Sequence, residues 1–174
     1  SGDKRQVLFC FACDPYCKAN DHYGLTRQAI IATHNAGMPV CILTKGGKRS
    51  LKDIDLFTPK DAYAVTLTCY SDEWSLQWEP GAAVTSERIE VLRKYHEAGI
   101  PTWVSLEPVI YPEDTLRLIE ATHDFVDEFK VGVLNYHERS NQIDWRKFAR
   151  EVIRVLDSLD CKYYLKKDLY KYIY

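Results

Sequence analysis

Short apolar runs alternate with longer amphipathic stretches along the whole chain. Apolar runs rich in β-branched and aromatic residues are typical of buried strands, and periodic stretches between them are typical of helices. This pattern predicts a first, buried strand within residues 7–17 and further strands at residues 40–44, 63–69, 102–110, 129–135 and 162–165. It predicts helices at residues 26–36, 50–57, 86–98, 113–125 and 144–159, and a long loop at residues 71–83. Such alternation predicts a parallel sheet with right-handed crossovers.

One face of the predicted strands is polar, which favours a barrel over a flat sheet. Thr66 and Thr68 share one face of their strand, and Ser105 and Glu107 share one face of the next, while apolar residues occupy the opposite faces. Strands of an open parallel sheet are usually apolar on both faces, whereas a barrel lumen that holds a polar ligand needs polar groups. A complete eight-unit barrel has about 250 residues. We therefore predict an α/β fold, a partial or open (βα)6-type TIM-like barrel, formed by residues 1–174 as a single domain.

Composition narrows the class of protein. The 174 residues are 46% hydrophobic and 28% charged, as in a globular domain, and the net charge of −2 gives no global attraction to nucleic acid or anionic membranes. Neither a long apolar segment nor a signal-peptide pattern is present, so we expect no membrane association. Cys41 and Cys69 lie in apolar runs, where a reduced cysteine acts as a small hydrophobe. The cysteines thus favour a reducing, cytoplasmic location.

Three cysteines near the N-terminus leave two interpretations open. Cys10, Cys13 and Cys17 have the spacing C-x2-C-x3-C, which could hold zinc or an iron–sulfur cluster. Alternatively, they are one strand cysteine and two loop cysteines that share no ligand. If the strand continues through Cys13, then Cys10 and Cys13 point to opposite faces and cannot share a metal. We therefore expect no metal site within this chain.

Candidate ligand-binding residues follow three of the predicted strands. Asp14 lies before Pro15, where the first strand must end, and sites of parallel α/β proteins lie at the carboxyl ends of strands. Lys45 precedes a glycine pair at residues 46–47 that would let a ligand approach the backbone. It is either an anion-binding cation or a solvated turn lysine. Glu107 is a carboxylate in an apolar strand, so we expect it to contact a ligand or to pair with a lysine or arginine.

The C-terminal residues are basic and rich in tyrosine. Interleaved cations and aromatic rings can bind nucleic acid through phosphate contacts and stacking. The alternative is a solvated helix face whose tyrosines pack on the core. The residues concerned are Lys162, Lys166, Lys167, Lys171, Tyr163, Tyr164, Tyr170, Tyr172 and Tyr174.

Several stretches in series resemble the radical S-adenosylmethionine superfamily, in particular its spore photoproduct lyase-like branch. They are Phe11-Ala12-Cys13-Asp14-Pro15, Leu43-Thr44-Lys45, Val65-Thr66-Leu67-Thr68, Trp78-Glu79-Pro80-Gly81 followed by Arg88, and residues 104–110. Their order and spacing agree with the family over nearly the whole chain. The resemblance implies a six-stranded partial βα barrel whose lumen holds S-adenosylmethionine against a [4Fe–4S] cluster.

The resemblance also implies roles for single residues. Cys13 stands where the lyase has a serine that touches the cofactor, Lys45 matches a lysine that binds the carboxylate end of the cofactor, and Thr66 matches a strand serine on the same ligand. The full set of expected cofactor contacts, extended to the polar residues at the strand ends, is Cys13, Asp14, Lys45, Thr66, Thr68, Ser105, Glu107 and Asn135.

The sequence departs from the family pattern at two points, and both change what we expect of the chain's activity. The cluster motif C-x3-C-x2-C is missing, so we expect the chain to be the C-terminal portion of the barrel, with its cluster cysteines outside it. Such a fragment is expected to bind no cofactor and to be inactive by itself. Phe11 occupies the position of the lyase's hydrogen-donating cysteine, which argues against photoproduct repair itself.

The implied function is that of an enzyme forming a 5′-deoxyadenosyl radical that abstracts hydrogen from a substrate. The sequence leaves the substrate open, and nucleic acid is one candidate partner. Two alternatives remain. One is a conventional βα-barrel enzyme that acts on an anionic metabolite through Lys45 and Glu107, and the other is a non-enzymatic nucleic-acid-binding module.

Overall fold

The strands of this chain form one parallel sheet in which sequence neighbours are also spatial neighbours. The computed structural model describes residues 5–10 and 12–173, and Phe11 and Tyr174 therefore lie outside the described residues. The six strands follow the order β1-β2-β3-β4-β5-β6, and every pair is parallel. They are β1 (Val7–Phe9), β2 (Val40–Thr44), β3 (Ala62–Thr66), β4 (Thr102–Leu106), β5 (Glu128–Val131) and β6 (Tyr163–Leu165).

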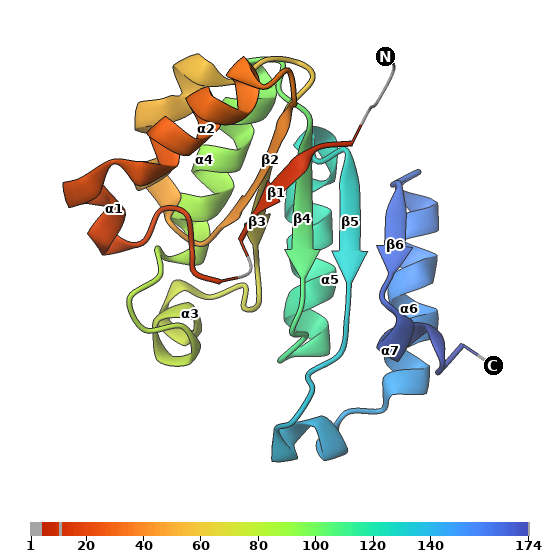
Figure 1. Cartoon of the computed structure of the whole chain (residues 1–174). Coiled ribbons are helices and arrows are strands. Elements are labelled where there is room, and N and C mark those ends of the chain that lie inside the picture. The colour runs from red at the N-terminus through yellow and green to blue at the C-terminus, as the bar shows by residue number, and fades with distance from the viewer. Residues whose placement is uncertain (1–4, 11, 174) are drawn as a thin grey trace.

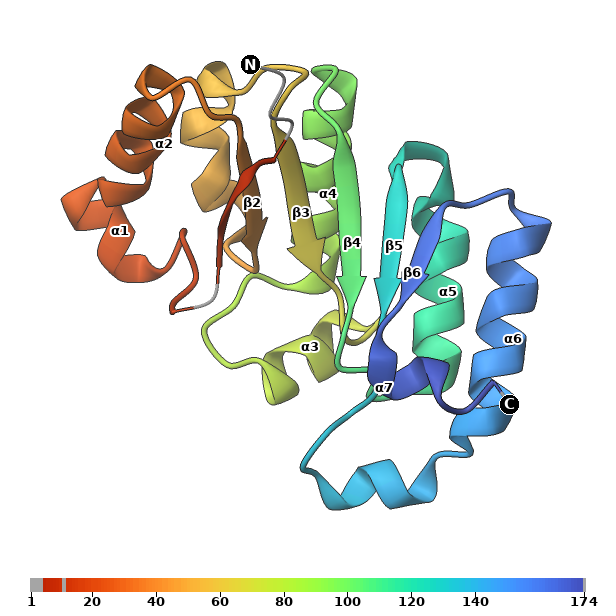
Figure 2. The same cartoon turned by 45° about the vertical axis from the view of Figure 1, so that its right-hand side comes forward.

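The long helices cover one face of the sheet, and two short helices lie beyond the strand ends (Figures 1 and 2). Helices α2, α4, α5 and α6 pack behind the strands, while α3 and α7 lie near the carboxyl ends, where the arrows point. The α-helices are α1 (Lys18–Tyr23), α2 (Leu25–Asn35), α3 (Asp72–Trp78), α4 (Thr85–Glu97), α5 (Pro112–Thr122), α6 (Trp145–Ser158) and α7 (Lys167–Tyr170). The 3-10 helices are η1 (Gly47–Leu56), η2 (His123–Phe125) and η3 (Glu138–Gln142).

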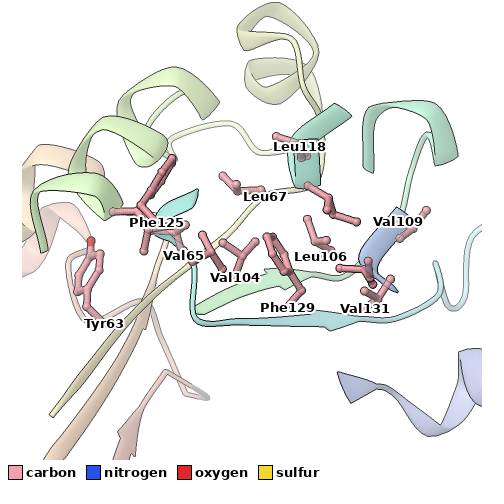
Figure 3. Close-up of a cluster of buried hydrophobic side chains, with 14 of the residues drawn as sticks. Tyr63, Val65, Leu67, Val104, Leu106, Val109, Leu118, Phe125, Phe129 and Val131 are labelled. Carbon is pink, nitrogen blue, oxygen red and sulfur yellow. The ribbon is translucent and has the colours of Figure 1, made fainter. Parts of the chain in front are cut away.

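The main hydrophobic core lies between the sheet and these helices. Val65 of β3, Val104 of β4 and Phe129 of β5 point toward Leu118 of α5 and Phe125 of η2 (Figure 3). All of them are buried, and each fully buried side chain of this size stabilises the fold by about 1.5–3 kcal/mol. The helix-facing positions alternate with positions on the opposite face, as the strand period of two requires.

The opposite, inner face of the sheet divides into an apolar and a polar half. Trp103 fills the amino-terminal half, where its indole N–H points at the Cys41 sulfur at 3.2 Å and Ala62 and Ala64 complete a small apolar cluster. The Lys130 ammonium lies 3.8 Å from the centre of the Trp103 ring, a cation–π contact. The carboxyl-terminal half of this face carries the polar side chains of the next section.

Several local predictions need correction. Strand β1 ends at Phe9 and has intermediate and exposed residues, because it is an edge strand rather than the buried strand that its composition suggested. Helices α1 and α3 were not predicted, and α3 replaces part of the expected loop 71–83. Asp144 caps the N-terminus of α6, since its side chain accepts a hydrogen bond from the Lys147 amide at 2.9 Å. Throughout the part of the chain that is described, no helix combines the length and apolar character needed to cross a membrane.

A buried carboxylate, Asp61, ties the start of β2 to the turn before β3. One of its oxygens accepts from the Val40 amide at 2.7 Å and lies 2.9 Å from the His34 ring nitrogen. The other accepts from the amide and hydroxyl of Thr58, both at 2.8 Å. Burial alone would raise the pKa of this carboxyl, but the hydrogen bonds outweigh it and the pKa is lowered.

Replacing Asp61 by alanine should destabilise the fold, because it leaves the buried Val40 amide without an acceptor and removes both bonds to Thr58. We expect a loss of about 2–5 kcal/mol in the free energy of unfolding, measured by urea denaturation. Asp124→Ala is the control, since Asp124 is exposed and lies 3.7 Å from Arg93. A change below about 0.5 kcal/mol in both variants would contradict the assigned role.

Candidate functional site

A cleft of about 380 Å³ opens on the inner face at the carboxyl ends of the strands. It brings together most of the predicted contacts, namely Cys13, Asp14, Lys45, Thr66, Ser105 and Glu107. Four further residues line it, namely Cys10, Leu43, Thr44 and Lys166. The alternation of polar and apolar positions along the strands thus placed Thr66, Ser105 and Glu107 on this surface, and the ligand role of each residue stays a prediction.

The Asp14 carboxylate organises the turn after β1. Its Oδ1 accepts from the Tyr16 amide at 2.8 Å and from the Thr44 hydroxyl at 2.6 Å. Its Oδ2 accepts from the Lys45 amide at 2.6 Å. These bonds join the loop after β1 to the end of β2, so Asp14 contributes to the cleft mainly by holding its neighbours in place.

Lys45 is held at its backbone and at its ammonium. Its amide donates to Asp14, its carbonyl accepts from the Ala83 amide at 2.9 Å, and its Nζ lies 2.9 Å from Glu79 Oε1. The side chain is still 38% exposed at the cleft. The lysine is therefore oriented by the protein, which differs from a freely solvated turn lysine.

The glycine pair after Lys45 serves packing within the chain instead of leaving the backbone open to a ligand. A Cβ on Gly46 would overlap the Tyr16 side chain, and a Cβ on Gly47 would overlap Glu87. Gly47 also has φ +56°, a left-handed conformation that favours glycine. The expectation that these glycines expose the backbone is corrected accordingly.

Glu107 forms the second charged pair of the cleft. Its carboxylate pairs with the Lys166 ammonium, which comes from the residue directly after β6. Directly after the adjacent strand β5, Gly132 leaves room for this carboxylate, because a Cβ there would overlap it. Of the two alternatives expected for Glu107, the structure shows the pairing with a lysine, which joins the ends of β4 and β6, while contact with a ligand stays a prediction.

A buried charge pair supports the Lys45 side of the cleft. Arg88 of α4 is fully buried, and its NH1 lies 2.7 Å from Glu79 Oε2. Burial alone would raise the pKa of the Glu79 carboxyl, but the charges of Arg88 and Lys45 outweigh it and the pKa is lowered. Glu79 is therefore ionised at neutral pH and lies between two cations.

Two predicted contacts lie away from the cleft lining. Thr68 is buried beyond the end of β3, because the regular strand stops at Thr66 and the alternation of faces no longer applies. Asn135 is exposed after β5, with its amide nitrogen 3.5 Å from Asp168 Oδ2. Their predicted contact with a cofactor is not tested by these positions.

The N-terminal cysteines differ from the expected strand geometry. Because β1 ends at Phe9, Cys10 and Cys13 line the same cleft, and the argument from opposite strand faces does not hold. The sulfurs form no disulfide, and burial raises the pKa of the Cys10 thiol, against the effect of the nearby Lys166 charge. Within residues 5–10 and 12–173, no group of three or more His, Cys, Asp or Glu side chains is arranged to hold a metal.

Some of the C-terminal tyrosines pack on the rest of the chain, and others are exposed. Tyr163 donates to Asp157 at 3.0 Å, and Tyr172 packs against Trp145 of α6. Tyr164 and Tyr170 are exposed. Packing on the core therefore accounts for part of this segment, while its exposed rings leave the nucleic-acid alternative untested.

Comparisons with known proteins concern the fold. No family model and no curated protein sequence matches the chain. Among solved structures, Streptococcus suis SuiB bound to S-adenosylmethionine is similar with a TM-score of 0.71 and 11% sequence identity, over 97% of this chain and 40% of SuiB. The chain has the fold of a partial βα barrel. The matched region corresponds to about two fifths of the length of SuiB.

Two further solved structures are also similar in fold to this chain. SuiB bound to precursor peptide SuiA is similar with a TM-score of 0.71 and 11% identity, over 96% of this chain and 39% of SuiB. A domain of pyruvate-formate lyase-activating enzyme from Bacteroides vulgatus gives 0.65 and 11% identity, over 92% of this chain and 98% of that domain. The predicted fold class, with six parallel strands in an open arrangement, is confirmed.

Sequence reasoning missed Glu79, Arg88 and Lys166 as site residues. Glu79 and Arg88 did stand in the stretches that carry the family resemblance, but no periodicity placed them near Lys45. Lys166 follows a strand directly, as Lys45 does, and could have been found by the same rule.

Replacing Glu79 by glutamine should make stability less dependent on pH. The folded-state pKa of Glu79 is lowered from 4.5, so its ionised form stabilises the fold above that pH, and this contribution is lost as the pH falls through the folded-state pKa. Between about pH 7 and about pH 3, the free energy of unfolding should therefore fall less in Glu79→Gln than in the unmodified chain. Glu97→Gln, which changes an exposed carboxylate, should follow the unmodified chain. Parallel curves for Glu79→Gln and the unmodified chain would be inconsistent with an ionised, buried Glu79.

Proposed function

We propose that this chain forms the S-adenosylmethionine-binding part of a radical S-adenosylmethionine enzyme. The observation that supports this most is the oriented Lys45 ammonium at the edge of a cleft in a partial βα barrel. The similar fold of SuiB, a protein solved with S-adenosylmethionine bound, agrees with the assignment. The family resemblance of the stretches around Cys13, Lys45 and Thr66 points to the same ligand.

The residues of the cleft fit this ligand chemically. Its volume of about 380 Å³ lies within the usual range of ligand pockets, about 300–1,000 Å³. Lys45 would bind the carboxylate of the methionine part through a charge-assisted hydrogen bond. The hydroxyls of Thr66 and Ser105 would donate hydrogen bonds to the polar groups that remain or accept them, and the carboxylate of Glu107 would accept them.

The chemistry of such an enzyme comes from its cofactors. In the family, S-adenosylmethionine together with a [4Fe–4S] cluster supplies a 5′-deoxyadenosyl radical for hydrogen abstraction from a substrate. The described residues of this chain contain no three-cysteine set with metal-binding geometry, so the proposal assigns cluster ligation to none of them. This chain's own part is to bind the adenosyl cofactor, orient its amino-acid end and limit the access of water. The proposal thus departs from the expectation that the chain by itself binds no cofactor, because the cleft and its oriented lysine lie wholly within the chain.

Replacing Lys45 by methionine should weaken the binding of S-adenosylmethionine to the 174-residue chain, measured by isothermal titration calorimetry. Loss of a charge-assisted hydrogen bond of about 1.5–3 kcal/mol corresponds to an affinity loss of about ten- to a hundredfold. Methionine keeps the apolar stem of lysine, so the fold and the melting temperature should change little.

Lys48→Met is the matched control, because Lys48 is an exposed lysine that pairs with Glu90 and does not line the cleft. It should bind S-adenosylmethionine as the unmodified chain does. Equal affinity in Lys45→Met and the control would contradict the role of Lys45. Binding of inorganic phosphate in place of S-adenosylmethionine would favour the alternative, a βα-barrel enzyme that acts on an anionic metabolite.

A further inference from the structure

The loop between α3 and α4 contacts Lys45 at two points, one of them the buried carboxylate of Glu79. Glu79 follows α3 directly and is only 9% exposed, while Lys45 Nζ lies 2.9 Å from its Oε1. The Ala83 amide of the same loop donates to the Lys45 carbonyl at 2.9 Å. This loop therefore contacts both the main chain and the charged end of Lys45.

Arg88 fixes this loop from inside the core. Its Nε donates to the Ala83 carbonyl at 2.6 Å, and its NH1 donates to the Thr66 carbonyl at 2.8 Å. Its NH2 donates to the Ser75 hydroxyl of α3 at 3.1 Å, and the remaining charge is balanced by Glu79. A guanidinium with three hydrogen bonds and one ion pair has little freedom, and the Glu79 carboxylate lies between its charge and that of Lys45.

A lysine side chain has several rotatable bonds, and fixing it when a ligand binds costs conformational entropy. Glu79 removes part of this freedom before any ligand arrives. The Lys45 ammonium has three N–H donors, of which the contact with Glu79 uses one, so donors remain for a ligand in the cleft. Prior fixation of a binding group is a general route to higher affinity.

We propose that Glu79, held by Arg88, is the positioning residue that orients the Lys45 ammonium toward a carboxylate ligand in the cleft. This inference rests on the proposed function, because it concerns the same cofactor carboxylate. Glu79 acts only through Lys45 and does not itself line the cleft. The inference therefore predicts that the effects of changing the two residues are not independent.

A double-mutant cycle tests this with two probes. S-adenosylhomocysteine carries the amino-acid carboxylate, whereas methylthioadenosine has the same adenosine part and lacks the carboxylate. Their affinities are measured by calorimetry for the unmodified 174-residue chain, Glu79→Gln, Lys45→Met and the double variant. Glu90→Gln is the control, since it removes an exposed carboxylate that pairs with Lys48 and Lys94.

Glu79→Gln should weaken S-adenosylhomocysteine binding by up to about tenfold, which is no more than the loss expected for Lys45→Met, and leave methylthioadenosine binding unchanged. The double variant should bind S-adenosylhomocysteine as weakly as Lys45→Met alone. Glu90→Gln should bind both probes as the unmodified chain does. Glu79→Asp keeps the charge but shortens the side chain, and it should weaken S-adenosylhomocysteine binding as well.

The outcomes separate the inference from the proposed function. The inference is wrong if the effects of the two substitutions on the free energy of binding are additive. It is also wrong if Glu79→Gln weakens the binding of both probes equally, because Glu79 then has only a general structural role. An unmodified chain that binds neither probe would overturn the proposed function itself. A chain that binds both probes but does not respond to Lys45→Met would remove the carboxylate site on which the inference depends.

Discussion

The site depends on one buried cation. A guanidinium that loses its water must find partners inside the protein, because an unpaired buried charge costs several kcal/mol. Arg88 is fully buried and obtains its partners from three places, the end of β3, helix α3 and the loop that carries Glu79 and Ala83. These segments all lie within residues 66–88, so satisfying Arg88 fixes the unit between β3 and α4 in one arrangement beside Lys45.

The fold was largely predictable because its determinants are local and repetitive. Apolar residues recur with a period of two in each strand and with a longer period in the long helices. Because strands and helices alternate along the chain, few topologies are possible for the parallel sheet. The placement of Thr66, Ser105 and Glu107 on one surface follows from the same period. The prediction was wrong where the period ends, as at Thr68, because a residue beyond the last strand pair is no longer bound to alternate.

The charge network was not predictable from patterns along the chain. Arginine is almost never fully buried unless it is paired, so its position in an amphipathic helix gave no reason to place Arg88 in the core. Helix α3 has only seven residues, too few for a helical period to be recognised among its tryptophans. Cys10 and Cys13 were assigned to opposite faces on the assumption of a longer strand, and the early end of β1 removes that assumption.

The sequential order of the strands has a consequence for how such a sheet assembles. Because each strand pairs with the one before it in the sequence, every pairing closes a loop of roughly one βα unit. Closing a loop of this size costs less entropy than joining distant segments, and topologies dominated by near contacts fold faster. The sheet can therefore grow outward from its central strands one unit at a time. The groups that meet at Arg88 all belong to one such unit, residues 66–88, so they come together as that unit forms, without a separate search.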